Sequence, residues 1–494
     1  MKKSPHLLAM IMTRYSILLF LAGQLCAQGY DNPLTIQGID HNTIQSAASR
    51  AEGGITIGIE NDVSTMFVNP ASMQSLSGLQ ISIGGLEQYT SANQVQQYAP
   101  LKYYSNFSLL MEGLTGYISN PDTSFHGTNA GDTVQRPFDN IGPNWRRKAQ
   151  KGLPVQAMIG IPLKVGDIGI SIGIGAVEYA NLNHYYQNNN VLFPAIGSER
   201  PIPTPLPKGT DSLPVQWSQY LRQRDGSIRG YGLAFSISPI EKLSLGISTL
   251  ALTGSTDDYE QHTGRGTLLF FANWFRLDSV YNRVTSTGTS NYSGQEFTFS
   301  GIYHAQNISV GFSIKPPLTI TRTFTSRIQT DTSAVPTVTT VSGEDKIRLP
   351  WRGTLGLSLL LKEYLTLGLE YELRSFASAV YTNTTGAESN PWLSSSVLHL
   401  GAEYRAMDWL SLRVGLREQA EVFEPEGNPI IGDPVSYRVY TAGCGLKFER
   451  IRLNLTYEYG SMNYDDAWQT NVNLNHESRH TVMADIVYDL PWTW

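Results

Sequence analysis

The sequence predicts an all-β fold, a transmembrane antiparallel β-barrel of about 14 strands with an N-terminal plug inside its lumen. Three observations favour this fold. Many segments alternate strictly between apolar and polar residues, no long apolar stretch follows residue 27, and the final alternating segment ends on an aromatic residue, Trp494. A barrel hides its membrane-spanning character in this alternation, because only one face of each strand meets lipid.

The first 27 residues have the order of a secretory signal peptide. Lys2 and Lys3 precede a short apolar run at 15–23, and a small residue, Ala27, closes the segment. The apolar run is too short to span a membrane as a helix. We therefore expect a signal peptide, a plug and a barrel at 1–27, 28–77 and 78–494.

The two cysteines and the net charge exclude several classes of protein. Cys26 would be a lipid attachment site only if small residues preceded it, and Gln24 and Leu25 stand there. Cleavage leaves Cys444 alone, so no disulfide can form within the mature chain. The net charge of −6 becomes more negative when the basic leader is removed, which argues against nucleic acid as a partner.

The period-two segments separate a barrel from a soluble β-sandwich. Each carries one apolar face and one polar or charged face, and the clearest examples are 364–374, 399–406, 410–417 and 451–459. A sandwich strand also alternates, but its apolar face meets a second sheet. Long strands that recur this often fit a lipid-facing belt better, and a closed barrel satisfies every backbone group in hydrocarbon.

The last alternating segment also indicates where the protein is inserted. From Val482 to Trp494, every second residue is apolar or aromatic. This pattern resembles the C-terminal signal by which outer-membrane barrels are recognised, so we expect the barrel-assembly machinery as a partner. The expected location is the outer membrane of a Gram-negative bacterium, in contact with outer-membrane lipid and lipopolysaccharide.

Six tight connections between alternating segments are interpreted as periplasmic turns, at 164–167, 238–242, 315–318, 361–364, 405–408 and 448–450. With both chain ends periplasmic, six turns require fourteen strands and seven outer loops. We place these loops near 91–152, 187–227, 261–298, 332–345, 381–393, 423–435 and 464–477. Prolines in the second loop exclude regular pairing, and the apolar run 268–275 in the third either extends a strand pair or lines an outer groove.

The segment before the first strand is rich in small residues. Asn69 can cap a short helix, Pro70 suits its first turn and Gly78 can end it. A barrel of about 14 strands is wide enough to leak unless something fills it. We therefore expect this segment inside the lumen, with Met66 and Phe67 as walls of a pocket.

Several motifs resemble the FadL/TodX family of outer-membrane transport proteins. The matching stretches are "EGG" (52–54), "NDVSTMFVNPA" (61–71), "LPWRGTLGLSL" (349–359), "HLGAEYRAMDWLSLRVGL" (399–416) and "YTAGCGLKF" (440–448). Ser72 departs from the family, which usually has glycine there. The resemblance implies a plug motif that consists of Gly53, Gly54, Asp62, Phe67, Asn69, Pro70 and Ala71.

The resemblance also implies passage of long-chain fatty acids or other hydrophobic molecules. In the family, outer loops capture the ligand, an inner pocket holds it, and a gap at a kinked third strand releases it sideways. The turns place the third strand at 168–186, with Gly169, Gly173 and Gly175 on its inner face. These glycines are candidate gate residues, since glycine marks bends and close approaches, and they could equally make room for the plug.

The inner faces carry many charges. Arg405 and Arg413 are candidates to bind the head group of an anionic ligand, although such charges more often form salt bridges that brace a barrel. The run 145–148 could meet lipopolysaccharide phosphates or be a solvated loop. No histidines have metal-ligand spacing, the acidic pairs in the loops are at most weak calcium candidates, and no catalytic motif is visible. We therefore expect no metal, no cofactor and no enzymatic activity.

Three functions remain in competition. The first is a channel for hydrophobic small molecules, and the second is a FadL-like barrel that serves as a shuttle or partner in a secretion machine. The third, a general diffusion porin, conflicts with the plug. An elongated apolar cavity beside the Asn-Pro-Ala turn, open to the wall near the third strand, would favour the channel, whereas a solid lumen would favour the shuttle.

Overall fold

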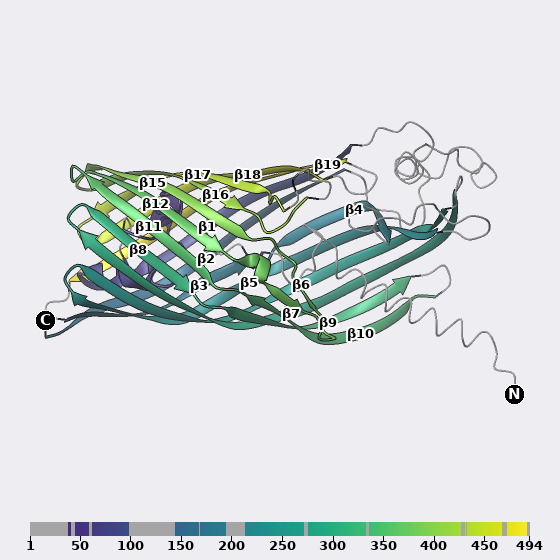
Figure 1. The fold of residues 1–494 in the computed structure, drawn as a ribbon, viewed down its shortest axis with the longest axis horizontal. Coiled ribbons are helices and arrows are strands. Elements are labelled where there is room, and N and C mark those ends of the chain that lie inside the picture. Colours follow the sequence, from purple (N-terminus) through teal and green to yellow (C-terminus); the bar gives the residue numbers. More distant parts are fainter. Residues whose placement is uncertain are drawn as a thin grey trace.

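The computed structural model is a closed antiparallel β-barrel (Figure 1). It describes residues 38–40, 45–58, 62–97, 144–166, 168–193, 213–270, 275–331, 335–425, 430, 432–466 and 472–491. The predicted signal peptide (1–27) and the terminal Trp494 lie outside these residues, so both stay predictions.

The described residues begin with short helices and continue as strands. The helices are α2 (Ala47–Ala51), η3 (Val63–Thr65), η4 (Pro70–Ser75) and, later, η5 (Phe376–Ser378). None of them is long and apolar enough to cross a membrane. The strands are β1 (Gly78–Gln97), β2 (Trp145–Val165), β3 (Ile168–Asn181), β4 (His184–Phe193), β5 (Leu213–Ile240), β6 (Leu243–Phe270), β7 (Phe275–Ala305), β8 (Ile308–Lys315), β9 (Leu318–Asp331), β10 (Thr337–Leu349), β11 (Arg352–Leu361), β12 (Leu365–Arg374), β13 (Val380–Thr382), β14 (Glu388–Ser389), β15 (Ser395–Met407), β16 (Leu410–Ala420), β17 (Ser436–Phe448), β18 (Ile451–Asp466) and β19 (Val472–Pro491).

The 19 elements form one sheet, and five junctions within it are interruptions rather than turns. These junctions are β3/β4, β8/β9, β10/β11, β12/β13 and β14/β15, so the barrel has fourteen strands, as the sequence predicts. β8 and β9, for example, both pair with β7, on either side of Pro316 and Pro317. β1 pairs with β19 from Gly78 to Gln97, which closes the barrel.

Five of the six predicted turns are confirmed, and one is wrong. The connection at 315–318 is a break inside a strand, because Pro316 and Pro317 have no N–H to donate to a ladder. The sixth turn instead joins β7 to β8, where Ala305 pairs with Ile308. The predicted number of strands is still correct, because the wrong turn at 315–318 and the missed turn between β7 and β8 cancel in the count.

The strands are much longer than predicted on the outer side. β5, β6 and β7 have 28, 28 and 31 residues and extend far from the short turns toward the opposite end of the barrel (Figure 1). Most of the predicted loop 261–298 is therefore paired strand, and the run 145–148 begins β2 rather than lying on a loop. β6 and β7 pair as far as Phe270 and Phe275, so the apolar run 268–275 extends a strand pair, and its residues 271–274 lie outside the described part.

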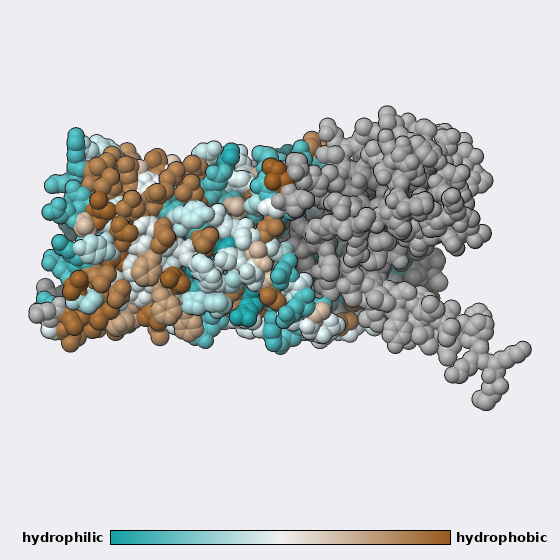
Figure 2. Space-filling model, in the orientation of Figure 1, coloured by the Kyte–Doolittle hydropathy of each residue, from teal (hydrophilic) through white to brown (hydrophobic). Residues whose placement is uncertain are grey.

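The two faces of the strands differ as the alternation predicts. On β12, Leu369 and Leu373 are exposed on the outer surface, whereas Glu370 and Arg374 on the opposite face are 3% and 6% exposed. Figure 2 shows the apolar residues gathered, on the visible face, over the part of the barrel next to the short turns. Polar residues buried inside an apolar band are typical of a membrane barrel and the reverse of a soluble sandwich.

A charge placed in this band should destabilise the barrel. Val414 on β16 is 59% exposed and lies beside Leu412 on the same face, so Val414→Arg would put a guanidinium into lipid. We expect a loss of about 2–4 kcal/mol in the free energy of unfolding, measured by denaturant titration in lipid vesicles. Val335→Arg is the control, because Val335 is also exposed, at 68%, but lies in the connection between β9 and β10. Equal effects of both substitutions would contradict the position of the lipid band.

Candidate functional site

The residues before β1 lie against the inward-facing side chains of the barrel. We call residues 45–58 and 62–77 the N-terminal segment. The backbone N–H of Ala47 donates to Asp485 (2.7 Å), that of Thr56 to Glu370 (2.8 Å), and that of Ala71 to Ser300 (2.9 Å). These partners belong to β19, β12 and β7, so the segment contacts walls that are distant from one another along the sheet.

Local chemistry explains how the N-terminal segment folds. Ser46 caps α2 by accepting a hydrogen bond from Ser49 N–H, and Asp62 caps η3 by accepting one from Ser64 N–H. Pro70 occupies the first turn of η4, as predicted. Asn69 departs from the prediction, because its side chain makes no cap and donates instead to the Thr56 carbonyl (2.8 Å). Gly78 departs as well: η4 ends before it, with Leu76 as its C-cap, and Gly78 is the first residue of β1.

The remaining plug-motif residues touch the barrel wall. Gly53 and Gly54 form a turn against His399 of β15, which hydrogen-bonds the Gly53 carbonyl at 2.7 Å. The Pro70–Ala71 backbone is pressed against Gly246 of β6, where a side chain would collide with it. These contacts leave no room for larger residues at either place.

Met66 and Phe67 are fully buried in a packed apolar cluster, and they do not line the cavity described below. The same cluster contains Met73 of the N-terminal segment and Met158 and Val177 of the strands β2 and β3. At this level the N-terminal segment therefore packs directly against β2 and β3.

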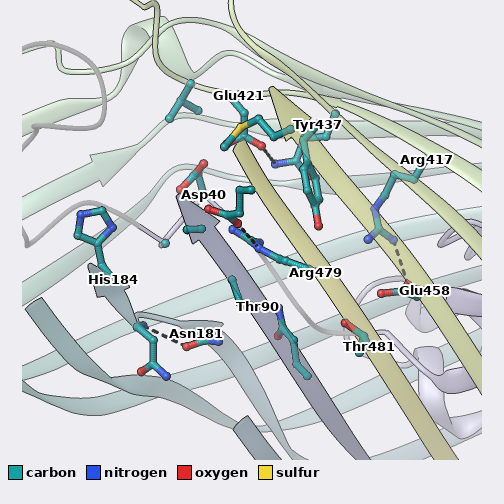
Figure 3. Close-up of a pocket in the computed structure, with 18 of the residues that line it drawn as sticks. Asp40, Thr90, Asn181, His184, Arg417, Glu421, Tyr437, Glu458, Arg479 and Thr481 are labelled. Atoms are coloured by element: carbon teal, nitrogen blue, oxygen red, sulfur yellow. Dashed lines mark hydrogen bonds and ion pairs between the residues drawn. The ribbon is translucent and has the colours of Figure 1, made fainter. Parts of the chain in front are cut away.

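A cavity of about 320 Å³ lies next to this cluster. The N-terminal segment contributes Arg50, Thr56 and Val68 to its lining. In Figure 3, Asn181 and His184 lie on one side of the cavity, and Arg417, Glu458 and Arg479 lie on the other. The cavity is thus lined by charged groups of both signs, whereas the sequence argument looked for an apolar one.

One carboxylate in this cavity is shared by two cations. Glu458 of β18 lies 3.4 Å from Arg50 of α2 and 3.6 Å from Arg417 of β16. One positive charge is left over in this triad, and guanidinium groups bind carboxylates and phosphates well. This part of the cavity therefore has the chemistry to accept an anionic group.

The two arginines predicted as head-group ligands lie elsewhere. Arg413 is buried and pairs with Glu52 of the N-terminal segment (3.0 Å) and with Glu403 (2.8 Å). Arg405 is exposed near the turn between β15 and β16. Neither lines the cavity, and Arg413 has the bracing contacts that inward charges commonly have.

The wall is interrupted beside the cavity. β2 pairs with β3 from Val165 only as far as Gln156, whose partner is Val177. The rest of β2 pairs with β1, and among the described residues it has no ladder to β3 or β4. In the part of the chain that the structure describes, side chains bridge this interval: Lys151 pairs with Glu178 at 3.0 Å, and the rings of Trp145 and Tyr185 are 5.4 Å apart.

The three candidate gate glycines lie below this interruption, where the β2–β3 ladder is intact. A side-chain carbon at Gly173 would lie 2.7 Å from Met66 Sδ, and one at Gly175 would lie 2.6 Å from Met66 Cε. At Gly169 the nearest atom would be Gln74 Oε1, at 2.9 Å. All three glycines therefore make room for the N-terminal segment.

A further buried cluster escaped the sequence argument. Glu296 of β7 accepts hydrogen bonds from Tyr179 of β3 (2.8 Å), Lys315 of β8 (2.6 Å) and Arg352 of β11 (2.6 Å). Glu296 fell within a predicted loop and Lys315 within a predicted turn. The only available signal was that Lys315 and Arg352 each adjoin a proline-containing interruption. Within the described residues, no group of His, Cys, Asp and Glu side chains could hold a metal ion.

Comparison with known proteins supports the fold. No protein-family model and no curated protein sequence matches this chain. Among solved structures it is similar to a FadL homologue of Pseudomonas aeruginosa (TM-score 0.57, 11% identity, 90% of this chain and 98% of the other). It is also similar to the CymD monoaromatic hydrocarbon channel (0.52, 10%, 91% and 99%) and to the toluene transporter TodX of P. putida (0.52, 12%, 91% and 99%). The chain therefore has the barrel fold of these channels over nearly its whole length.

Proposed function

We propose that this protein is an outer-membrane channel for hydrophobic small molecules that carry a polar head group, long-chain fatty acids being the simplest case. The outer loops capture the ligand, the cavity holds it beside the N-terminal segment, and it leaves sideways through the wall. The N-terminal segment is the plug that closes the lumen, and lipid and lipopolysaccharide surround the barrel.

The observation that carries the proposal is the end of the β2–β3 ladder beside the cavity. Lys151 of β2 and Tyr185 of β4 line the cavity and also stand on the two edges of the interrupted wall. A ligand in the cavity can thus leave through this interval toward the outer surface of the barrel without crossing the lumen. Each methylene gains about 0.8 kcal/mol when it stays out of water, so a sideways exit favours a long apolar chain.

The charges of the cavity favour a ligand with a head group over a bare hydrocarbon. The solved neighbours are described as carrying monoaromatic hydrocarbon or toluene. In this chain Arg50 and Arg417 face a single Glu458, which leaves a positive charge that a carboxylate or similar group would balance. A hydrocarbon offers no group that could pair with these two arginines.

Closing the wall chemically tests the exit. In a Cys444→Ala background, Lys151→Cys and Glu178→Cys would be joined by a short reducible cross-linker across the interrupted wall. We expect most uptake of fatty acid by cells that depend on this protein to stop, and reductant to restore it. Leu163→Cys with Ile170→Cys is the matched control, because these partners lie on the same strands where the ladder is intact. Unchanged uptake after complete cross-linking would rule out the sideways exit.

The ligand itself can be identified by mass spectrometry of amphiphiles that copurify with the barrel. We expect molecules with an apolar chain and an anionic head, and fewer of them in an Arg417→Met variant. If no amphiphile is bound and uptake does not depend on the gene, the channel proposal fails, and the secretion-shuttle alternative gains support.

A further inference from the structure

The upper part of β3 departs from the regular ladder at a bend. Its residues alternate between buried and exposed from Ser171 to Ile174, but the four residues from Val177 to Ala180, with Tyr179 among them, are all buried in succession. The pairing with β5 shifts register between Glu178 and Ala180, which marks a bulge. The ladder to β2 has already ended at Val177, so backbone hydrogen bonds hold this bend on one edge only.

The side chain at the centre of the bend reaches a buried carboxylate. Tyr179 is fully buried, and its hydroxyl donates to Glu296 of β7 at 2.8 Å. Lys315 and Arg352 hold the same carboxylate, each at 2.6 Å, and they are direct partners in the β8–β11 ladder. Glu296 is thus held by one cation on the adjacent strand β8 and one on the next strand, β11, and it presents a fixed acceptor to Tyr179.

The position of Glu296 in its own strand is also unusual. β7 pairs with β9 as far as Gly294 and with β8 from Phe299 onward. Between these residues, opposite Pro316 and Pro317, β7 has no ladder partner on that side in the described structure. Glu296 therefore lies in the unpaired interval of β7, and its carboxylate accepts the hydrogen bond from Tyr179 of β3, the strand whose ladder to β2 has ended.

We propose that Glu296 is a latch that holds the bend of β3 inward through Tyr179 and thereby keeps the interval between β2 and β4 open. Tyr179 and Glu296 are positioning residues, since they act through the backbone of β3. Loss of the latch lets the bend relax toward β2, which narrows the interval. The inference rests on the proposed function only in assigning transport to that interval; the latch itself is a property of the fold.

Hydrogen exchange on the full-length barrel tests the latch without reference to transport. Tyr179→Phe removes one hydroxyl and leaves the ion pairs of Glu296 intact. Loss of a hydrogen bond to a charged group raises the equilibrium constant for local opening by roughly tenfold. We therefore expect amide exchange in residues 177–183 to become about tenfold faster, and uptake to fall.

Tyr220→Phe is the matched control. The Tyr220 hydroxyl also donates to a glutamate at 2.8 Å, Glu260, but the two residues belong to neighbouring strands with an intact ladder. We expect this variant to leave exchange at 177–183 unchanged. Glu296→Gln is the second test variant and should accelerate exchange further, because it leaves Lys315 and Arg352 without their counter-charge.

The outcomes separate the two proposals. Unchanged exchange at 177–183 in both Tyr179→Phe and Glu296→Gln would overturn the latch, whatever the uptake. Exchange could be faster in these variants alone while wild-type cells take up no amphiphile. That result would support the latch proposal and contradict the channel proposal. Faster exchange with uptake that stays at the wild-type level would reject the link between the bend and the exit.

Discussion

Gly53→Ala is expected to displace the N-terminal segment from the barrel wall and to raise the conductance of the barrel. Gly53 has φ +74°, a conformation that is unfavourable by about 1–2 kcal/mol for an L-residue with a side chain. An added methyl carbon would also lie 2.6 Å from the Leu400 carbonyl oxygen and 2.7 Å from that of Leu416. Both oxygens belong to paired strands of the wall, so the segment is the part that must move.

The measurement is single-channel conductance in planar bilayers, supported by the sensitivity of cells to large antibiotics. Gly386→Ala separates backbone strain from steric collision. Gly386 has φ +84°, but no atom lies within 4 Å of the carbon that would be added. This control should have the backbone strain without the collision and should leave conductance unchanged. If a folded Gly53→Ala barrel conducts no better than the wild type, the N-terminal segment does not close the lumen.

A second large effect is expected from pH, through Glu52 in the turn after α2. Burial raises the pKa of this carboxyl from 4.5 to about 8; Arg413 opposes the shift and Glu403 adds to it. The folded protein therefore keeps a proton on Glu52 at pH values where the unfolded chain has lost it. The stability from this proton is fully present below about pH 4.5 and is lost as the pH rises through 8.

The free energy of unfolding should therefore fall between pH 5 and pH 8, with a slope from this group of at most ~1.4 kcal/mol per pH unit. Glu52→Gln should remove that slope, because the amide does not titrate. The test is the difference between wild type and variant in denaturant titrations at several pH values, which cancels all other titrating groups. The exposed Glu388 offers Glu388→Gln as a control. Parallel curves for wild type and Glu52→Gln would disprove the role of Glu52.

The sequence predicts this barrel well where lipid imposes a pattern and poorly elsewhere. Strand β12 could be placed by its alternation because lipid tolerates no charge on the outer face. The outer parts of β5, β6 and β7 stand beyond the apolar band, so polar residues on both faces made them resemble loops. Pro316 and Pro317 were mistaken for a turn because a turn and a break in a ladder need the same local chemistry.

In the candidate site, too, local features could be predicted from the sequence and long-range contacts could not. Pro70 in the first turn of η4 could be inferred, since a proline at that position is favoured by local geometry. The partners of Arg413 could not, because Glu52 lies more than three hundred residues away and meets it only in the closed barrel. Glu296 and Tyr179 were missed for the same reason: no local pattern indicates a contact across a lumen.

The hydrogen bond between Ala47 and Asp485 implies an order of assembly. It joins positions 438 residues apart, one near the start of the described chain and the other in the last strand. Contacts of such high sequence separation form late, because closing a long loop costs conformational entropy that only the folding of the intervening strands offsets. The N-terminal segment can therefore reach its final position only after β19 has joined the barrel. The N-terminal segment is synthesised before any strand of the barrel, but it is the last part to reach its final position.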